Sequence, residues 1–228
     1  MPMGKSVFSK NIQENKPYII AKIAQSLDGC IASKNGSSQW ISSVESRRRV
    51  HILRSEVDAV MVGKGTVQKD NPELTVRDVL GLNPFRVITD AEMKLSFKIF
   101  SDRWRHNTIV LTSHIHAKKK KALNLIDAGV KVLAVELEPN GKLNIETAFR
   151  LMHEQFSIGS IMVEGGGILL SSIAKSQLID EIHFFIAPII LGHGVKSFSE
   201  LEVGKLESAL SFKTRAIAKS GPRSTRCI

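Results

Sequence analysis

The sequence predicts a single α/β domain with a mostly parallel central sheet. Short apolar runs alternate along the chain with segments of helical periodicity, which is the pattern of α/β proteins. Most of these runs are apolar throughout, which indicates strands that are covered on both faces, as in a parallel sheet. The chain has 228 residues, of which 43% are hydrophobic and 6% aromatic, enough for one aliphatic core but not for a second full domain.

The predicted strands are segments rich in apolar and β-branched residues. In chain order they are Tyr18–Ala24, Ala59–Gly63, Arg86–Thr89, Thr108–Thr112, Lys131–Val135, Ile161–Glu164 and Ile182–Ala187. Residues 1–16 are polar and aperiodic, so they are interpreted as a flexible leader. The fold is therefore expected to begin near Pro17 and to form one domain over residues 17–228.

Helices are expected between these strands, where periodic segments are bounded by Ser, Asn or Gly caps. They are Val44–Ser55, Ala117–Ala128, Ile145–Gln155 and Ile168–Ser176. After Leu191 the alternation ends. A Gly-His-Gly loop leads to Val195–Leu201, then to a further strand at Ala209–Ala218 and a Gly221-Pro222 turn. This tail is expected to add antiparallel strands at the edge of the sheet.

Composition argues against a membrane or secreted protein. The apolar run Ile182–Leu191 is interrupted by His183 and Pro188 and is shorter than the ~20 residues of a spanning helix. The N-terminus lacks the apolar stretch of ~7–15 residues found in a signal peptide. Cys30 and Cys227, near opposite ends of the chain, do not form a disulfide framework. A reducing, cytoplasmic location is therefore expected, with no membrane partner.

The chain carries a formal charge of +10, which suits an anionic partner. One alternative is a nucleic-acid-binding module, with Lys118–Lys121 and the C-terminal arginines as its basic patch. Aromatic residues for base stacking are scarce, and most charge runs are solvated helix faces. A phosphorylated small molecule is therefore favoured, and no nucleic-acid partner is expected.

The first candidate motif is Ala24-Gln25-Ser26-Leu27-Asp28-Gly29, where a predicted strand ends in a polar turn. An Asp-Gly pair after a strand is most often simply a hairpin or loop signal. The following loop, 36–40, adds a hydroxyl at Ser38 and an indole at Trp40, although Trp40 could equally be a core anchor.

The second candidate is the segment 62–77, directly after a predicted strand. Gly63, Gly65 and Thr66 could bring backbone amides close to a phosphate, and Asp70 and Arg77 flank a rigid Pro72 turn. The alternative is a strand, a turn and a polar loop without a ligand. The segment is not a P-loop, because it lacks Gly-Lys-Ser/Thr at the required spacing.

The third candidate is Val163-Glu164-Gly165-Gly166-Gly167, where a strand reaches an acid and then three glycines that open a helix. Amide hydrogens and the positive end of a helix dipole suit a diphosphate. The spacing is not that of the Rossmann fingerprint. Glu164 lies at the carboxyl end of a strand, where α/β proteins place groups that face ligands.

No metal site is predicted. His114 and His116 alternate near the end of a strand, but neighbouring Cys or acidic ligands at metal spacing are missing. The sequence also lacks a Gly-x-Ser-x-Gly elbow, a Cys-x-x-Cys pair and the zinc signature of nucleobase deaminases.

Taken together, in this order, these segments resemble the reductase domain of bifunctional riboflavin-biosynthesis deaminase-reductases, a relative of dihydrofolate reductase. The resemblance covers roughly residues 17–220. It rests on Ser26-Leu27-Asp28-Gly29, the loop 38–41, the helix with Arg47, Arg48 and Arg54, Gly65-Thr66-Val67, Asp70-Asn71-Pro72, Leu74-Thr75-Val76-Arg77, Val163-Glu164-Gly165-Gly166, and Ile186-Ala187-Pro188 with Leu191-Gly192.

The resemblance implies a dihydrofolate reductase-like fold and an NADPH-dependent reductase without a deaminase domain. Hydride transfer to the ribosyl C1′ of 5-amino-6-(5-phosphoribosylamino)uracil would open the sugar to the ribitylamino product, and the domain would form a homodimer. The implied residues are Lys22, Asp70 and Glu164 for catalysis; Ser38, Arg54, Leu74 and Arg77 for substrate; and Ala24, Trp40, Thr66, Asp70, Gly166, Gly167, Ile168, Leu169 and Leu170 for cofactor.

The chain departs from the family pattern at several positions. Asn71 stands where a second acid is frequent, Ala91 where serine is frequent, and Cys30 where a basic residue is common. One alternative is a reductase of the same fold acting on another pterin-like or pyrimidine substrate. Another is a paralogue that binds nucleotide without turnover, against which the intact Lys22, Asp70 and Glu164 argue.

Overall fold

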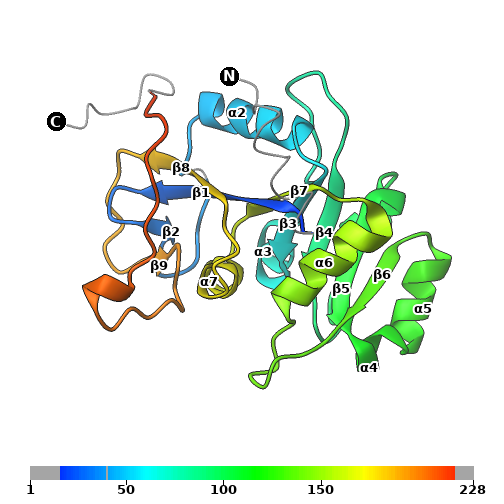
Figure 1. The fold of residues 1–228 in the computed structure, drawn as a ribbon. Coiled ribbons are helices and arrows are strands. Elements are labelled where there is room, and N and C mark those ends of the chain that lie inside the picture. Colours follow the sequence, from blue (N-terminus) through cyan, green and yellow to red (C-terminus); the bar gives the residue numbers. More distant parts are fainter. Residues whose placement is uncertain (1–15, 40, 219–228) are drawn as a thin grey trace.

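The structure, a computed structural model, describes residues 16–39 and 41–218 (Figure 1). Its main sheet has seven strands in the order β6-β5-β4-β3-β7-β1-β8. The strands are β1 Tyr18–Ser26, β3 Ala59–Gly63, β4 Phe85–Thr89, β5 Thr108–Ser113, β6 Lys131–Val135, β7 Ser160–Glu164 and β8 Glu181–Ala187. Residues 1–15 of the predicted leader, Trp40 and the Gly221-Pro222 turn lie outside the described residues.

Every strand pair of this sheet is parallel, in agreement with the prediction of a mostly parallel sheet. Strand β1 shows why its residues are apolar throughout. Ile19 and Ile23 pack into the core on one face of the sheet, whereas Tyr18 and Ile20 pack into a second core on the other face. A strand buried on both sides leaves no position for a solvated polar residue, and this explains the continuous apolar runs.

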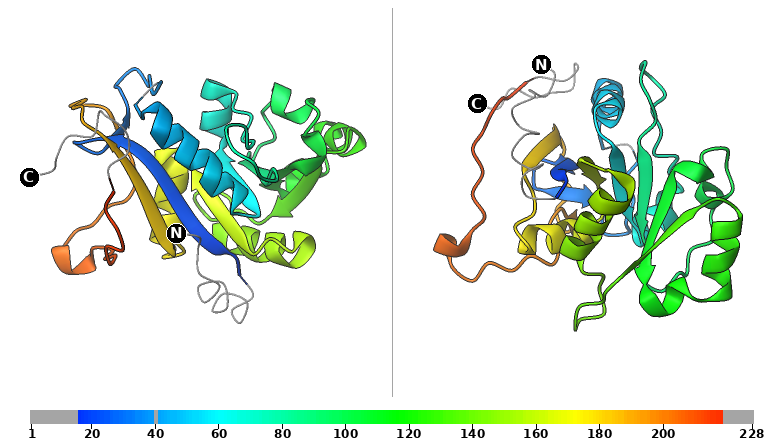
Figure 2. Two further views of the ribbon diagram at one scale, coloured as in Figure 1. Left: turned by 90° about the horizontal axis from the view of Figure 1, so that it is seen from above. Right: turned by 45° about the vertical axis from the view of Figure 1, so that its right-hand side comes forward.

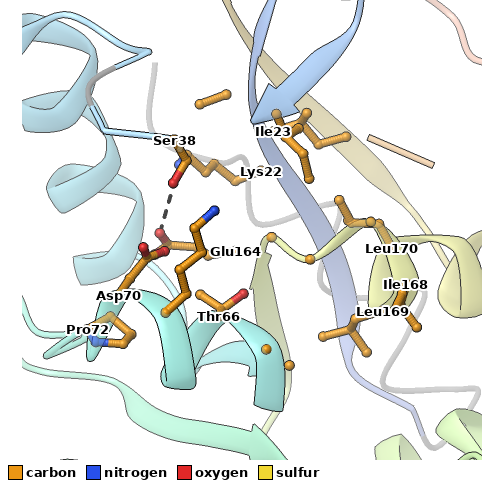
Figure 3. A pocket seen from close by; sticks show the side chains of 18 of the residues that line it. Lys22, Ile23, Ser38, Thr66, Asp70, Pro72, Glu164, Ile168, Leu169 and Leu170 are labelled. Carbon is orange, nitrogen blue, oxygen red and sulfur yellow. Dashed lines mark ion pairs between the residues drawn. The ribbon is translucent and has the colours of Figure 1, made fainter. Parts of the chain in front are cut away.

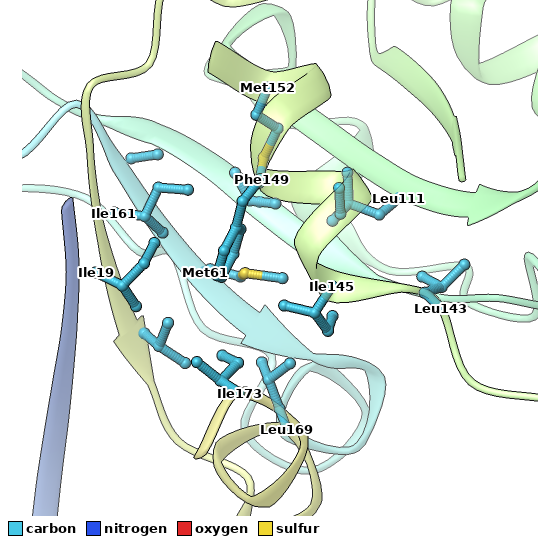
Figure 4. Close-up of a cluster of buried hydrophobic side chains, with 14 of the residues drawn as sticks. Ile19, Met61, Leu111, Leu143, Ile145, Phe149, Met152, Ile161, Leu169 and Ile173 are labelled. Carbon is cyan, nitrogen blue, oxygen red and sulfur yellow. The ribbon is translucent and has the colours of Figure 1, made fainter. Parts of the chain in front are cut away.

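Helices cover both faces of the twisted sheet (Figure 2). Helices α6 (Ile145–Phe156) and α7 (Gly167–Lys175) pack on one face, where Phe149, Met152 and Leu169 meet Ile19 and Met61 (Figure 4). The other core includes residues of α2 (Val44–Ser55), α3 (Lys64–Asp70) and α5 (Lys120–Asp127). The α/β class with a mostly parallel sheet is therefore confirmed.

The helix predicted at Ala117–Ala128 is two helices, α4 (His114–Ala117) and α5. The Ser113 hydroxyl accepts a hydrogen bond from the His116 amide and is the N-cap of α4. The helix therefore begins three residues before the predicted start at Ala117. Lys119 is then extended, with φ −78° and ψ 153°, and this interrupts the helix. Helix α3 was not predicted, because Gly65 in its first turn lowers the helical propensity of the segment.

The antiparallel part of the fold is a separate two-stranded sheet of β2 (Cys30–Ala32) and β9 (Val195–Lys196). Asp28 ties the two segments together, since its carboxylate accepts hydrogen bonds from Ser26 Oγ at 2.6 Å and from the amides of Leu191 at 3.1 Å and Gly192 at 2.7 Å. The hydrogen bond from Ser26, followed by those from the two amides, holds the pKa of Asp28 well below its usual range, although burial opposes this.

The prediction of a strand at Ala209–Ala218 is wrong, because these residues form no β-ladder with another described segment. A strand needs a partner and a face to bury. The apolar side chains of this segment find neither, since Phe212 stays 50% and Ile217 92% exposed. A short 3₁₀ turn, Leu206–Ser208, precedes it, and the turns Lys98–Phe100 and Arg105–Asn107 lead into β5. Within residues 16–39 and 41–218, none of the helices combines the length and apolar character needed to cross a membrane.

Candidate active site

A cavity of about 960 Å³ opens at the carboxyl ends of the parallel strands, where α/β proteins place their ligands. The ends of β1, β3, β4 and β7 form its floor, and α2, α3, the first turn of α7 and the loop 71–77 form its walls. All three segments singled out from the sequence contribute to it. Segments far apart in the chain thus converge on one site.

Three charged side chains that line this cavity, Lys22, Glu164 and Arg54, lie close to one another, and Figure 3 shows the first two. Lys22 on β1 and Glu164 on β7 are register partners in neighbouring parallel strands, and their charged groups lie 4.0 Å apart. Arg54 of α2 forms a bidentate ion pair with Glu164. Its Nε donates to Oε1 at 2.6 Å, and its Nη2 donates to Oε2 at 2.9 Å. The Glu164 carboxylate is therefore shared by two cations.

Burial and charge shift the pKa values in this cluster. Burial lowers the pKa of the Lys22 ammonium; the Glu164 carboxylate opposes this effect and Arg54 adds to it, so the net shift is downward. Burial alone would raise the pKa of Glu164, but the charge and hydrogen bonds of Arg54 outweigh it, and the pKa is lowered. Glu164 therefore stays ionised, whereas Lys22 gives up its proton more readily than an exposed lysine.

Two side chains of α2, His51 and Arg54, also contact the loop 73–78. Arg54 Nη1 donates to the carbonyl of Thr75 at 2.9 Å, and His51 Nδ1 lies 3.1 Å from the same oxygen. The other ring nitrogen of His51 faces Asp78 at 3.5 Å. Burial, and then the charge of Arg54, lower the pKa of His51. A largely neutral imidazole thus joins the helix to the loop that carries Arg77.

This loop places an arginine at the mouth of the cavity. Leu74 has φ +55° and is buried, so the packing of its side chain holds a backbone conformation that non-glycine residues rarely adopt. Arg77 follows, with its side chain 48% exposed and Nη1 donating to Glu73 at 2.9 Å and to Thr75 Oγ1 at 3.1 Å. Ser38 also lines the cavity.

Asn71 ends helix α3 in the left-handed conformation, with φ 40° and ψ 54°, and its amide donates to the carbonyl of Val67. Asparagine tolerates this conformation better than most residues other than glycine. The departure from the family pattern at this position therefore has a structural explanation. Asp70, the residue before it, lines the cavity.

The glycines between β7 and α7 form a cradle that fits a diphosphate. Gly165 and Gly166 have φ +91° and +84°, where side chains are strained. A Cβ on Gly167 would lie 2.7 Å from the carbonyl oxygen of Lys196, and one on Gly166 would lie 3.6 Å from Thr66 Oγ1. The first amides of α7 have no partners within the helix and point away from it. These residues therefore fit the diphosphate of a dinucleotide cofactor.

Most of the residues implied by the resemblance line this one cavity: Lys22, Ala24, Ser38, Arg54, Thr66, Asp70, Leu74, Arg77, Glu164, Gly166, Gly167, Ile168, Leu169 and Leu170. Trp40 lies outside the described residues. The roles of all these residues remain predictions. Arg54 differs from expectation in one respect, because its guanidinium is occupied by Glu164 and Thr75, which leaves Arg77 as the more open of the two arginines.

Several lining residues were not predicted, among them His51, Lys142 and Leu143. Lys142 and Leu143 come from a turn after β6, closed by a bridge between Leu137 and Leu143, that no motif marks in the sequence. Among the described residues, no group of three or more His, Cys, Asp or Glu side chains is arranged to hold a metal ion.

Comparison with known proteins gives a consistent result. Residues 17–223 match the family model described as the RibD C-terminal domain. The riboflavin biosynthesis protein RibD of Aquifex aeolicus is 39% identical over 217 residues, which are 94% of this chain and 58% of that protein. The 2,5-diamino-6-ribosylamino-4(3H)-pyrimidinone 5′-phosphate reductase of Archaeoglobus fulgidus is 34% identical over 189 residues, which are 78% of this chain and 83% of that protein.

Among solved structures, a diaminohydroxyphosphoribosylaminopyrimidine deaminase/5-amino-6-(5-phosphoribosylamino)uracil reductase from Thermotoga maritima has a TM-score of 0.76 and 30% identity, covering 94% of this chain and 57% of that one. RibD of Acinetobacter baumannii has a TM-score of 0.79 and 27% identity, covering 92% and 57%. The chain thus spans little more than half the length of several relatives that it matches.

Proposed function

This chain belongs to the RibD C-terminal domain family, and from that membership we propose that it reduces a phosphoribosylamino-pyrimidine to its ribitylamino product in riboflavin biosynthesis. The observation that carries the proposal is the Lys22, Glu164 and Arg54 cluster beside a glycine cradle in one cavity. The favoured substrate is 5-amino-6-(5-phosphoribosylamino)uracil. The name of the Archaeoglobus relative makes the undeaminated diamino compound the main rival substrate.

The reaction needs one proton and one hydride. The ribosyl C1′–O4′ bond breaks with its electron pair going to O4′, which takes up a proton, and C1′ accepts the hydride. A bound reduced nicotinamide would supply that hydride, and the glycine cradle, Thr66 and Asp70 would hold the dinucleotide. Lys22 is the proposed proton donor to O4′, because its buried ammonium has a lowered pKa.

The other residues of the site would orient Lys22 and the ribose and would balance the charge of the ammonium. Glu164 would keep the Lys22 ammonium in place and accept hydrogen bonds from the ribose hydroxyls. Arg54 would act as a positioning residue for Glu164, since its guanidinium donates two hydrogen bonds to that carboxylate. Asp70, the last residue of α3, would accept a hydrogen bond from a further ribose hydroxyl. Fixing the reacting carbons in contact in this way accounts for much of the rate in such a reaction.

Arg77 is the proposed contact for the substrate phosphate, because it is the more exposed guanidinium at the cavity mouth. Replacing Arg77 with glutamine is expected to raise KM for the phosphorylated substrate by about ten- to hundredfold, with a small change in kcat. Steady-state kinetics would measure this. Arg150→Gln, which removes an equally exposed arginine from α6, is the matched control. An unchanged KM in Arg77→Gln would exclude Arg77 from phosphate binding.

NADPH is the proposed form of the cofactor, and the cytoplasm is the proposed location. A buried, free thiol at Cys30 supports a reducing compartment.

We also propose a homodimer formed through β8. This strand is the last in the sheet, so one of its edges has no strand partner among the described residues. Its side chains Phe184 and Ile186, on one face of the strand, are also 47% and 51% exposed. Exposed edges of this kind favour association with another strand. Sedimentation equilibrium is expected to show a dimer that Phe184→Lys dissociates. A wild-type monomer at micromolar concentration would refute this proposal.

The direct test of the function is oxidation of the reduced nicotinamide by the purified chain. The deaminated substrate, its undeaminated precursor and dihydrofolate are offered in parallel, and loss of cofactor absorbance is followed. Turnover of one phosphoribosylamino compound is expected, and the preferred one gives the order of reduction and deamination. Binding of the cofactor without turnover of either compound would refute the substrate assignment.

A further inference from the structure

One buried titratable side chain at the cavity has no part in the proposed mechanism. His51, on α2, is 6% exposed and lines the cavity. Arg47, Val50 and Arg54 line the cavity from the same helix, at spacings of three and four residues, so they share one face of α2 with His51. The imidazole therefore lies within one helical turn of two arginines.

The ring of His51 contacts the loop 73–78 at three places. Nδ1 lies 3.1 Å from the carbonyl oxygen of Thr75 and 3.4 Å from the amide nitrogen of Arg77. Nε2 lies 3.5 Å from Oδ2 of Asp78. Each ring nitrogen thus faces an oxygen acceptor, and Nδ1 also faces a donor.

The neutral ring of His51 cannot satisfy all three contacts. With its proton on Nε2, the ring donates to Asp78 and accepts from the Arg77 amide, but a lone pair of Nδ1 then faces the Thr75 carbonyl. With its proton on Nδ1, a lone pair of Nε2 faces the Asp78 carboxylate. Only the imidazolium donates to both oxygens, and it gives up the contact with the Arg77 amide. Protonation therefore exchanges a hydrogen bond at Arg77 for one at Thr75.

The loop has other anchors besides His51. Arg54 Nη1 donates to the Thr75 carbonyl at 2.9 Å, and the Val76 amide donates to Asn83 Oδ1 at 2.7 Å. Leu74 is buried. A substitution at His51 is therefore expected to leave the loop folded and to change only its end, where the amide of Arg77 meets the ring.

Charged groups on several elements decide which form of His51 prevails. Burial, and then the charge of Arg54, hold the pKa of His51 below its usual range, while Asp78 opposes both. The ring is therefore mainly neutral near neutral pH in the free protein. The charged groups around it are Arg47 and Arg54 of α2, Glu73, Arg77 and Asp78 of the loop, and Glu164 of β7, with Lys22 of β1 beyond it.

We propose that His51 is a positioning residue of the phosphate site, and that binding of the substrate phosphate at Arg77 is coupled to uptake of a proton by the His51 ring. This inference rests on the proposed function, in which Arg77 contacts that phosphate. A dianion at Arg77 offsets the positive charges of Arg54 and Arg77, and this favours the imidazolium. The imidazolium donates to Thr75 and Asp78, and the released amide of Arg77 can donate to a phosphate oxygen. Phosphate binding and proton uptake therefore favour each other.

A purely structural role for His51 predicts different behaviour. A ring that only fills the space between α2 and the loop would keep the same protonation state with or without an anion. Glutamine, which can donate or accept a hydrogen bond but carries no charge, would then replace His51 equally well or equally poorly at every pH. The protonation state of the ring therefore separates the two roles.

The first test follows the His51 imidazole by NMR in the full chain, with and without saturating sulfate at constant ionic strength. Sulfate is the probe because it stays a dianion over the whole titration, whereas a phosphate ester titrates near pH 6. The His51 signal is identified by its loss in His51→Gln. Its titration midpoint is expected to rise by about one to two pH units with sulfate. Arg77→Gln is expected to abolish this rise, and Asp78→Asn to lower the midpoint with and without sulfate.

The second test compares KM for the phosphorylated substrate in wild type and in His51→Gln across pH. The ratio of the two KM values is expected to be about three- to tenfold at about pH 6 and to approach one at about pH 8, where both rings are uncharged in effect. Titration of the substrate phosphate affects both proteins equally and cancels in the ratio, and kcat should change little. His153→Gln is the matched control, because His153 Nδ1 makes a similar contact, 3.0 Å from the carbonyl of Ile158, at the end of α6.

Three results would each overturn the proposal: a His51 midpoint that does not move with sulfate, a rise that persists in Arg77→Gln, or a KM ratio that is the same at every pH. Failure of the proposed function is distinguishable, because the NMR titration needs no turnover. A chain that shows the sulfate-dependent rise but reduces neither phosphoribosylamino compound would support the coupling of His51 to an anion and refute only the substrate assignment.

Discussion

Replacing Lys22 with methionine is expected to lower kcat by about 10²- to 10⁴-fold, the usual contribution of a positioned proton donor. Methionine has a similar length and cannot donate a proton. Because Lys22 is buried and its charged form is penalised there, the substitution should not destabilise the fold. Rapid-mixing kinetics on the phosphoribosylamino substrate would measure the loss, and thermal unfolding would check the fold.

The pH profile separates a proton donor from a structural lysine. The lowered pKa of Lys22 means that the active, protonated form should be lost with rising pH before an ordinary lysine would titrate. The wild-type rate should therefore fall at high pH along a limb that is missing from the residual activity of Lys22→Met. Binding of the reduced cofactor should be nearly unchanged. A variant with normal kcat would remove Lys22 from the mechanism.

Replacing Asp102 with alanine is expected to destabilise the protein by about 3–5 kcal/mol, the cost of leaving a buried charge unpaired. Arg86 is 1% exposed, and its Nη1 and Nη2 donate to Asp102 at 2.6 and 2.9 Å. The remaining hydrogen bonds of Arg86, to Thr108 Oγ1 and to the carbonyls of Ile99 and Glu73, go to uncharged acceptors and cannot neutralise the guanidinium. Urea unfolding would measure the loss.

The size of this effect should depend on pH. Burial would raise the pKa of Asp102, but the hydrogen bond from Arg86 outweighs it and the pKa is lowered. A lowered pKa in the folded state stabilises the protein above the unfolded pKa, and this stabilisation is lost as pH falls through the folded value. The difference in unfolding free energy between wild type and Asp102→Ala should therefore be largest near neutral pH and should decrease in acid.

Glu154→Ala is the matched control for Asp102→Ala. It also removes one carboxylate from an arginine, but the pair with Arg150 lies on the exposed face of α6. A solvated pair of this kind contributes about 0.5 kcal/mol or less. Equal destabilisation by the two substitutions would mean that the Arg86 pair is not buried as described.

The strands were predictable because burial on both faces allows only apolar residues. Strand β1 and its partners β7 and β8 leave a continuous apolar run in the sequence, and each observed strand of the main sheet overlaps a predicted one. The tail was not predictable in the same way. Ala209–Ala218 has residues that favour strands, but strand formation depends on a partner edge and on burial, and neither is visible in the sequence.

The candidate site was predictable as a set of motifs but not as a geometry. Glu164 could be placed at the carboxyl end of a strand from the glycines that follow it. Its contact with Lys22 depends on the pairing of β1 with β7, whose partners are 142 residues apart, from Lys22 to Glu164. The ion pair between Arg54 and Glu164 depends on the packing of α2 over the sheet. Pairing between distant strands leaves no local signal.

The charge of the chain illustrates the same limit. A formal charge of +10 indicated an anionic ligand without saying where it would bind. In the structure, Arg77 and Lys64 both line one cavity. Only the fold separates these lysines and arginines from those of the solvated surface.

The most direct test of the central claim is the fate of the hydride. The chain is incubated with the phosphoribosylamino substrate and with reduced cofactor that carries deuterium on one or the other face of the nicotinamide C4. Mass spectrometry and NMR of the product are expected to find one deuterium at the ribityl C1′ with one of the two cofactors. Deuterium on the pyrimidine ring, or its absence from a product that forms at full yield with both cofactors, would contradict reduction of the ribosyl group.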